Sequence, residues 1–109
     1  MSDEAIPTLD ELAERLAAAR GYLHIEENER RLHDLDAVIA QPGFWDDAQA
    51  AQATSKRASD IRSTLDEYRA ACATLEDARA ALELIEEDDA FAVEFDELRA
   101  GLSSALDRM

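Results

Sequence analysis

The chain contains 109 residues, of which 26 are acidic and 11 are basic, so its formal net charge is −15. Hydrophobic residues make up 47%, mostly Ala and Leu, and the chain has only 3 Gly and 2 Pro. Sheet proteins need β-branched strands and frequent turn residues, so this composition argues against all-β and α/β folds. We therefore expect an all-α protein that forms a single helical domain, residues 1–109.

The acidic excess is spread along the sequence, with 12 acids and 4 bases in residues 1–55 and 14 acids and 7 bases in residues 56–109. Proteins that bind nucleic acids or membrane surfaces normally present a basic face to phosphate groups. We therefore expect no autonomous nucleic-acid binding and no membrane partner. An acidic chain of this kind is suited to docking on a basic partner.

Cellular location follows from what the sequence lacks. Cys72 is the single cysteine, so no internal disulfide can form. No apolar run reaches the roughly 18–20 residues of a membrane span. The acidic start at residues 1–4 does not resemble a signal peptide. We expect a cytoplasmic protein.

Two helices are predicted before residue 41. Thr8 and Glu11 match a capping box, which begins the first helix. Gly21 is expected to end that helix in a left-handed C-cap. The second helix is predicted from about residue 25 to residue 40. Apolar positions recur by threes and fours on one face of each helix: Leu9, Leu12, Leu16 and Ala19, then Ile25, Leu32, Leu35 and Ile39.

A long third helix follows a decisive break at Gln41-Pro42-Gly43. Asp46 or Asp47 can cap it, and no Gly or Pro occurs from there to Glu87. About 40 residues at 1.5 Å each predict a helix of roughly 60 Å. Its apolar seam has coiled-coil-like spacing: Ala58, Ile61, Leu65, Tyr68, Cys72, Leu75, Ala78, Leu82 and Ile85.

The acidic run at residues 86–89 is expected to end the third helix, because like charges at a helix C-terminus oppose its dipole. A fourth helix then runs to the end of the chain. Short connections fold the helices back on one another, which predicts an elongated antiparallel bundle of four helices with a coiled-coil-like hairpin. We expect the first helix to pack on the second. The seam of the fourth helix is Phe91, Phe95, Leu98, Leu102, Ala105 and Leu106.

Catalytic constellations are missing from the sequence. His24 and His33 are nine residues apart, so on one helix they would point to opposite faces. There is no HExxH motif, no Gly-rich phosphate loop and no calcium loop. Cys72 falls in the apolar seam and is interpreted as a small core residue. We therefore expect no enzyme activity, no cofactor and no metal site.

Phe44 and Trp45 form the most informative pair, because two large aromatics in a connection are costly to expose. We favour a structural role in which Trp45 closes the end of the bundle. The alternative is an anchor for a partner, since Trp is enriched at binding hot spots.

Three segments resemble the N-terminal domain of bacterial peptide chain release factor 2: residues 20–25, 30–35 and 41–52. The positions that carry the resemblance include Gly21, Phe44, Trp45 and Asp46. The pair Phe44-Trp45 after Pro42 is similar to release factor 2 rather than release factor 1. The sequence departs from the family at His24, where the family usually has Asp at the start of the second helix.

The resemblance implies a function for a full-length release factor 2. Such a protein recognises UGA and UAA stop codons and triggers peptidyl-tRNA hydrolysis on the ribosome. Those tasks belong to domains with a Ser-Pro-Phe tripeptide and a Gly-Gly-Gln loop, and neither motif occurs here. We expect the chain to be a first domain that docks and positions, without catalysis. The implied partners are the stalk base and GTPase-associated region of the large ribosomal subunit, and the class II release factor GTPase.

Local arginines are the candidate contacts with ribosomal RNA, because the overall field is acidic: Arg30, Arg31, Arg57 and Arg62. Two other readings stay open at this point. The chain could be a free-standing acidic coiled-coil adaptor or chaperone, which would not need the Pro-x-Phe-Trp-x-Asp pattern. It could also be an enzyme on a helical bundle, which would need clustered buried carboxylates or histidines.

Overall fold

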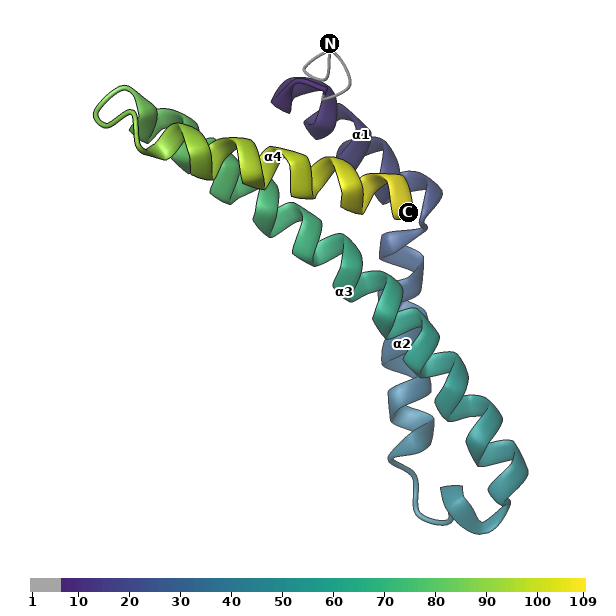
Figure 1. Cartoon of the computed structure of the whole chain (residues 1–109). Helices are drawn as coiled ribbons and strands as arrows, with labels where there is room; N and C mark the ends of the chain where they lie inside the picture. The colour runs from purple at the N-terminus through teal and green to yellow at the C-terminus, as the bar shows by residue number, and fades with distance from the viewer. Residues whose placement is uncertain (1–6) are drawn as a thin grey trace. The chain divides into compact units, whose positions relative to one another are not determined.

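The computed structural model describes residues 7–109, and these residues form four α-helices and one 3-10 turn without any strand (Figure 1). The prediction of an all-α protein with four helices and a long third helix is confirmed. The acidic start at residues 1–4 lies outside the described residues. The elements are α1 (Leu9–Tyr22), α2 (Ile25–Ile39), η2 (Phe44–Asp46), α3 (Ala48–Ile85) and α4 (Phe91–Arg108).

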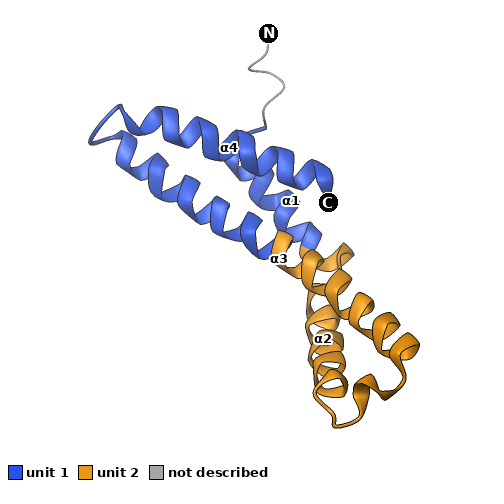
Figure 2. Cartoon of the chain, turned by 60° about the horizontal axis from the view of Figure 1, so that its bottom comes forward, with its two compact units in different colours: residues 1–19, 68–109 blue, residues 20–67 orange. Residues whose placement is uncertain are grey.

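The helices divide into two compact units (Figure 2). Unit 1 holds the described residues up to Ala19 together with Tyr68–Met109, and unit 2 is Arg20–Glu67. Both boundaries fall inside helices, one near the end of α1 and one within α3. Each unit therefore contains its own part of α3.

Unit 1 contains most of α1, the second part of α3 and all of α4, and the turn after Ile85 makes α3 and α4 antiparallel neighbours (Figure 2). Its largest fully buried side chains include Leu12 of α1 and Leu102 of α4. An ion pair at 3.1 Å joins Arg15 Nη2 of α1 to Asp107 Oδ1 of α4.

The expectation that the first helix packs on the second is wrong. Leu12, Leu16 and Ala19 are buried in unit 1, together with the second part of α3 and α4. The physical reason is that an apolar stripe carries no information about its partner, because hydrophobic burial is not directional. Helices that follow one another in the sequence therefore need not pack against each other.

Unit 2 is a hairpin of α2 and the first part of α3, joined by residues 40–47. Ile25 is the only residue of α2 that is buried, whereas the predicted stripe at Leu32, Leu35 and Ile39 is half-buried. On α3 the buried positions are small or β-branched near the connection, since a small side chain lets two helix backbones approach closely: Ala51, Ala58 and Ile61, followed by Leu65.

The start of α1 has the predicted capping box. The Thr8 backbone N–H donates to Glu11 Oε1 at 3.1 Å, and the Glu11 backbone N–H donates to Thr8 Oγ1 at 3.2 Å. These bonds lower the pKa of the Glu11 carboxyl below its ordinary value, because they favour its charged form. Both partners satisfy backbone donors that the first turn of a helix leaves free.

The predicted C-cap at Gly21 is wrong, because Gly21 lies within α1 and the left-handed residue is His24, with φ 52° and ψ 48°. Only Leu23 and His24 connect α1 to α2. Asn28 Nδ2 donates to the Leu23 carbonyl at 3.0 Å and holds this connection from the second turn of α2. His24 makes no side-chain capping bond.

The apolar seam of α3 differs from the prediction in two places, at Ala71, which is buried while the expected Cys72 is only half-buried, and at Leu82. Ala81 is buried and Leu82 is 47% exposed, although Leu82 was assigned to the seam. The small Ala81 side chain faces α4, and the next residue is turned about 100° away by the helical geometry. Cys72 is half-buried.

Candidate docking surface

The connection between α2 and α3 is a tightly bonded turn. Gly43 has φ 81°, a left-handed conformation that favours glycine, and its carbonyl accepts from the Asp46 N–H at 3.0 Å. A Cβ at Gly43 would lie 3.0 Å from Asp46 Oδ2, a tight contact that a small movement of the exposed Asp46 side chain would relieve. Asp47 Oδ1 accepts from the Ala50 N–H at 3.1 Å, which makes Asp47 the capping residue of α3. The signature residue Asp46 therefore shapes the turn rather than capping the helix.

The turn presents Trp45 to solvent. The Trp45 side chain is 61% exposed, whereas Phe44 is half-buried and meets the indole edge-on, with ring centroids 5.0 Å apart. The favoured expectation that Trp45 closes the end of the bundle is wrong, because Trp45 is mostly exposed and Phe44 is the more buried of the two rings. An exposed Trp held by a neighbouring ring has the features of a binding anchor.

The four candidate arginines divide into two kinds. Arg62 Nη2 donates to both oxygens of Asp36, at 2.9 Å and 2.8 Å. This pair joins α2 to α3, and the carboxylate raises the pKa of the Arg62 guanidinium. Arg62 therefore stabilises the hairpin of α2 and α3.

Arg31 of α2 and Arg57 of α3 line one shallow, open groove of about 200 Å³ with Asp34 and Leu35. Neither arginine has an ion-pair partner among residues 7–109, and the same is true of the neighbouring Arg30. Unpaired guanidinium groups keep all their donors available for phosphate or carboxylate ligands. These arginines are candidates from the sequence alone, but the groove that Arg31 and Arg57 share forms only where α2 pairs with α3.

Charge is divided unequally between the two units. The acidic and basic residues counted in residues 1–55 and 56–109 do not show this difference, because the units do not coincide with the two halves of the sequence. Residues 20–67 hold ten acids and six bases, a net charge of −4. The remaining sequence, residues 1–19 and 68–109, holds sixteen acids and five bases, a net charge of −11. The part of the chain with the exposed Trp is thus the less acidic part.

Within the described part of the chain, no group of three or more His, Cys, Asp or Glu side chains is arranged to hold a metal ion. His24 and His33 are both exposed. Cys72 lies in an open apolar groove with Leu16 and Leu75, which agrees with its interpretation as a packing residue.

A membrane-spanning helix is also absent from residues 7–109, because none of their helices is both long enough and apolar enough.

Comparison with known families places most of this chain in one family: residues 28–109, about three quarters of the chain, match the PCRF domain. The chain therefore belongs to the PCRF domain family, the N-terminal region of class I peptide chain release factors. The matched range contains most of α2, the Trp45 turn and all of α3 and α4.

Proposed function

We propose that the chain is the docking and positioning domain of a class I release factor of the release factor 2 type, and that it has no catalytic activity of its own. The observation that carries the proposal is the family match over residues 28–109, which contains the sequence Pro42-Gly43-Phe44-Trp45. The Phe-Trp pair is the feature that favours release factor 2. The proposed domain spans residues 1–109 and acts in the cytoplasm.

The proposed partners are the stalk base and GTPase-associated region of the large ribosomal subunit, with the class II release factor GTPase as a second partner. The docking surface is the exposed side of unit 2. Trp45 supplies an apolar anchor, and Arg30, Arg31 and Arg57 supply donors for ribosomal RNA phosphates. Arg62 serves this surface indirectly, by holding α2 against α3 through Asp36.

A domain exchange tests the proposal. The chain replaces the first domain of a bacterial release factor 2, and peptide release is measured on ribosomes programmed with UGA, UAA or UAG. We expect the chimera to release peptide at UGA and UAA. The 109-residue chain alone should release none, and stop-codon-dependent release by it would overturn the proposal.

Substitutions in the chimera test the surface. Trp45→Ala and the pair Arg31→Ala with Arg57→Ala should each raise the concentration needed for half-maximal release, because they remove contacts to the ribosome. Val93→Ala, a change of an exposed residue in α4, is the matched control and should leave that concentration unchanged. Equal effects of all three variants would contradict the assignment of the surface to unit 2.

The free-standing adaptor remains the competing function, but the family match does not favour it, because an adaptor has no need for the Pro-x-Phe-Trp-x-Asp pattern of residues 42–47. A photocrosslinking residue at position 45 distinguishes the two. Crosslinks to stalk-base protein or RNA in the ribosome-bound chimera support the docking function, and their absence supports the adaptor.

A further inference from the structure

An open apolar groove of about 330 Å³ lies between the end of α3 and the start of α4, within unit 1. Leu84 stands on its α3 wall and remains 37% exposed, and Phe91 on the α4 wall is half-buried. Each helix contributes a stripe with helical spacing. The lining residues are Asp77, Ala80, Ala81, Leu84, Phe91, Glu94 and Leu98.

The groove faces away from α1. Leu84 and Leu75 are nine residues apart on α3, which places them about 180° apart around the helix. Leu75 lies in the separate groove that α3 forms with Leu16 of α1. The described residues that line the Leu84 groove come only from α3 and α4, so α1 leaves it open.

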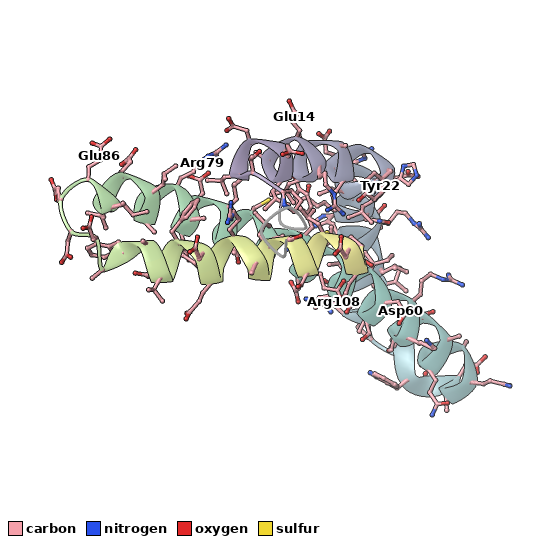
Figure 3. All side chains as sticks on the ribbon, turned by 45° about the horizontal axis from the view of Figure 1, so that its top comes forward. Glu14, Tyr22, Asp60, Arg79, Glu86 and Arg108 are labelled. Atoms are coloured by element: carbon pink, nitrogen blue, oxygen red, sulfur yellow. The ribbon has the colours of Figure 1, made fainter. Side chains whose placement is uncertain are left out.

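The surroundings of the groove are strongly acidic. Residues 76–97, here called the acidic hairpin, contain ten acids and one base. That base is Arg79, whose Nη1 pairs with Glu76 Oε1 at 2.7 Å. Figure 3 shows Glu86 where the chain turns from α3 towards α4. Asp77 and Glu94 belong to the groove lining itself, one on each helix.

We propose that this groove binds a basic amphipathic helix of a partner protein. The α3 wall from Asp77 to Leu84 covers seven residues, or about 10 Å at 1.5 Å per residue. This length fits apolar side chains at positions i, i+4 and i+7 of a bound helix. Lysines or arginines beside those positions then face Asp77 and Glu94. The proposal goes beyond the proposed ribosomal docking, because it concerns a different unit and a different partner chemistry.

The charge around the groove favours a basic helix over RNA or a second copy of the chain as its ligand. RNA phosphates would meet a hairpin with a net charge of −9, so they are repelled. A second copy of the chain would bring its own acidic hairpin to the interface and is disfavoured for the same reason. A basic protein segment is attracted, and its apolar face covers Leu84 and Phe91.

Fluorescence anisotropy with synthetic peptides tests the proposal on the 109-residue chain. The probe is a labelled Leu/Lys peptide with leucines at i, i+4 and i+7. One control peptide has Glu in place of every Lys, and the other has Ser in place of every Leu. We expect only the Leu/Lys peptide to bind, with an affinity that falls as salt is added.

Charge variants locate the binding site. Asp77→Asn with Glu94→Gln should weaken binding of the Leu/Lys peptide about fivefold, because two charge pairs at the groove are lost. The matched control is Glu14→Gln with Glu83→Gln, which removes the same charge from α1 and from outside the groove lining. It should change the affinity by less than about twofold.

Apolar variants test the groove independently of charge. Leu84→Gln should weaken binding about fivefold, since it removes an apolar contact that the peptide would bury. Leu82→Gln is the matched control, because Leu82 is exposed on the same helix and does not line the groove. Circular dichroism of each variant checks that helicity is retained.

Several results would overturn the proposal. Equal binding of the Glu-containing or the Ser-containing peptide would exclude a basic amphipathic ligand. Equal effects of Leu84→Gln and Leu82→Gln would exclude the groove as the site. A concentration-dependent dimer by light scattering that Leu84→Gln abolishes would assign the groove to a second copy of the chain.

Discussion

The two units of this protein use the same helix α3 in different ways. Among residues 7–109, ten of the fifteen buried apolar side chains lie in unit 1 and five lie in unit 2. Unit 1 buries leucines from three helices, including Leu12, Leu75 and Leu102. Unit 2 buries only Ile25 from α2, and its buried α3 positions include Ala51 and Ala58.

The two units therefore differ in core size and in surface chemistry. Apolar burial is the main favourable term in folding, so unit 1 holds most of what keeps the chain folded. Unit 2 has the smaller core, and it presents an exposed aromatic and unpaired arginines. The charges follow the same division, since residues 1–19 and 68–109 have a net charge of −11 and residues 20–67 one of −4.

The largest expected effect is in the core of unit 1. Leu102→Ala should lower the free energy of unfolding by about 3 kcal/mol, because it leaves a cavity at a fully buried position. Chemical denaturation with urea measures the loss. Val93→Ala in the same helix removes an exposed side chain and should cost less than about 0.5 kcal/mol. Similar losses of unfolding free energy in both variants would contradict the assignment of a leucine core to unit 1.

The next effect tests the close approach of helices in unit 2. Ala58→Leu should lower the free energy of unfolding by about 2 kcal/mol, because the larger side chain has no space at a position that is 2% exposed. Ala53→Leu, at an exposed position of the same helix, is the control and should be nearly neutral. If Ala58→Leu stabilises the chain, α2 and α3 are not closely packed there.

The glycines of unit 2 should respond in opposite directions. Gly43→Ala should lower the free energy of unfolding by about 1.5 kcal/mol, because an alanine at φ 81° is strained. Gly21→Ala should raise it by about 0.5 kcal/mol, since Gly21 is helical and its added Cβ meets nothing within 4 Å. Thermal unfolding of both variants measures the signs. If Gly21→Ala destabilises the chain, Gly21 has the left-handed C-cap conformation and is not helical.

The smallest of the expected destabilising effects is at the start of α1 in unit 1. Thr8→Ala should cost about 1 kcal/mol, because it removes the capping hydroxyl. Glu11 has a pKa below its ordinary value of 4.5. Its contribution is therefore complete above pH 4.5 and is lost as the pH falls through the lowered pKa.

Thermal melts between neutral and acidic pH check this pH dependence. The difference in stability between wild type and Glu11→Gln should be largest at neutral pH and should shrink below pH 4.5. Glu14→Gln removes one charge from the same helix without touching the capping box and serves as the control. A difference that grows on acidification would contradict the capping-box assignment.

Much of the candidate docking surface was accessible from sequence, but not its geometry. Residues 41–47 identified a break, an aromatic pair and a helix cap, because turn chemistry depends on a few adjacent residues. The sequence could not show which aromatic faces inward. Of the four arginines that the sequence offered as contacts, Arg62 is paired with Asp36. The sequence could not reveal this pair, because Asp36 lies 26 residues away on another helix.

By itself, the sequence determined the helices, the break at Pro42-Gly43, the capping box at Thr8 and the acidic balance of the chain. These features depend on neighbours within about one helical turn. Only the tertiary structure decided that α1 joins the second part of α3 and α4, that Trp45 stays exposed and that Leu82 leaves the seam. The reason is that apolar burial has no direction, so an amphipathic helix specifies that it needs a partner and leaves the packing of the whole chain to select which one.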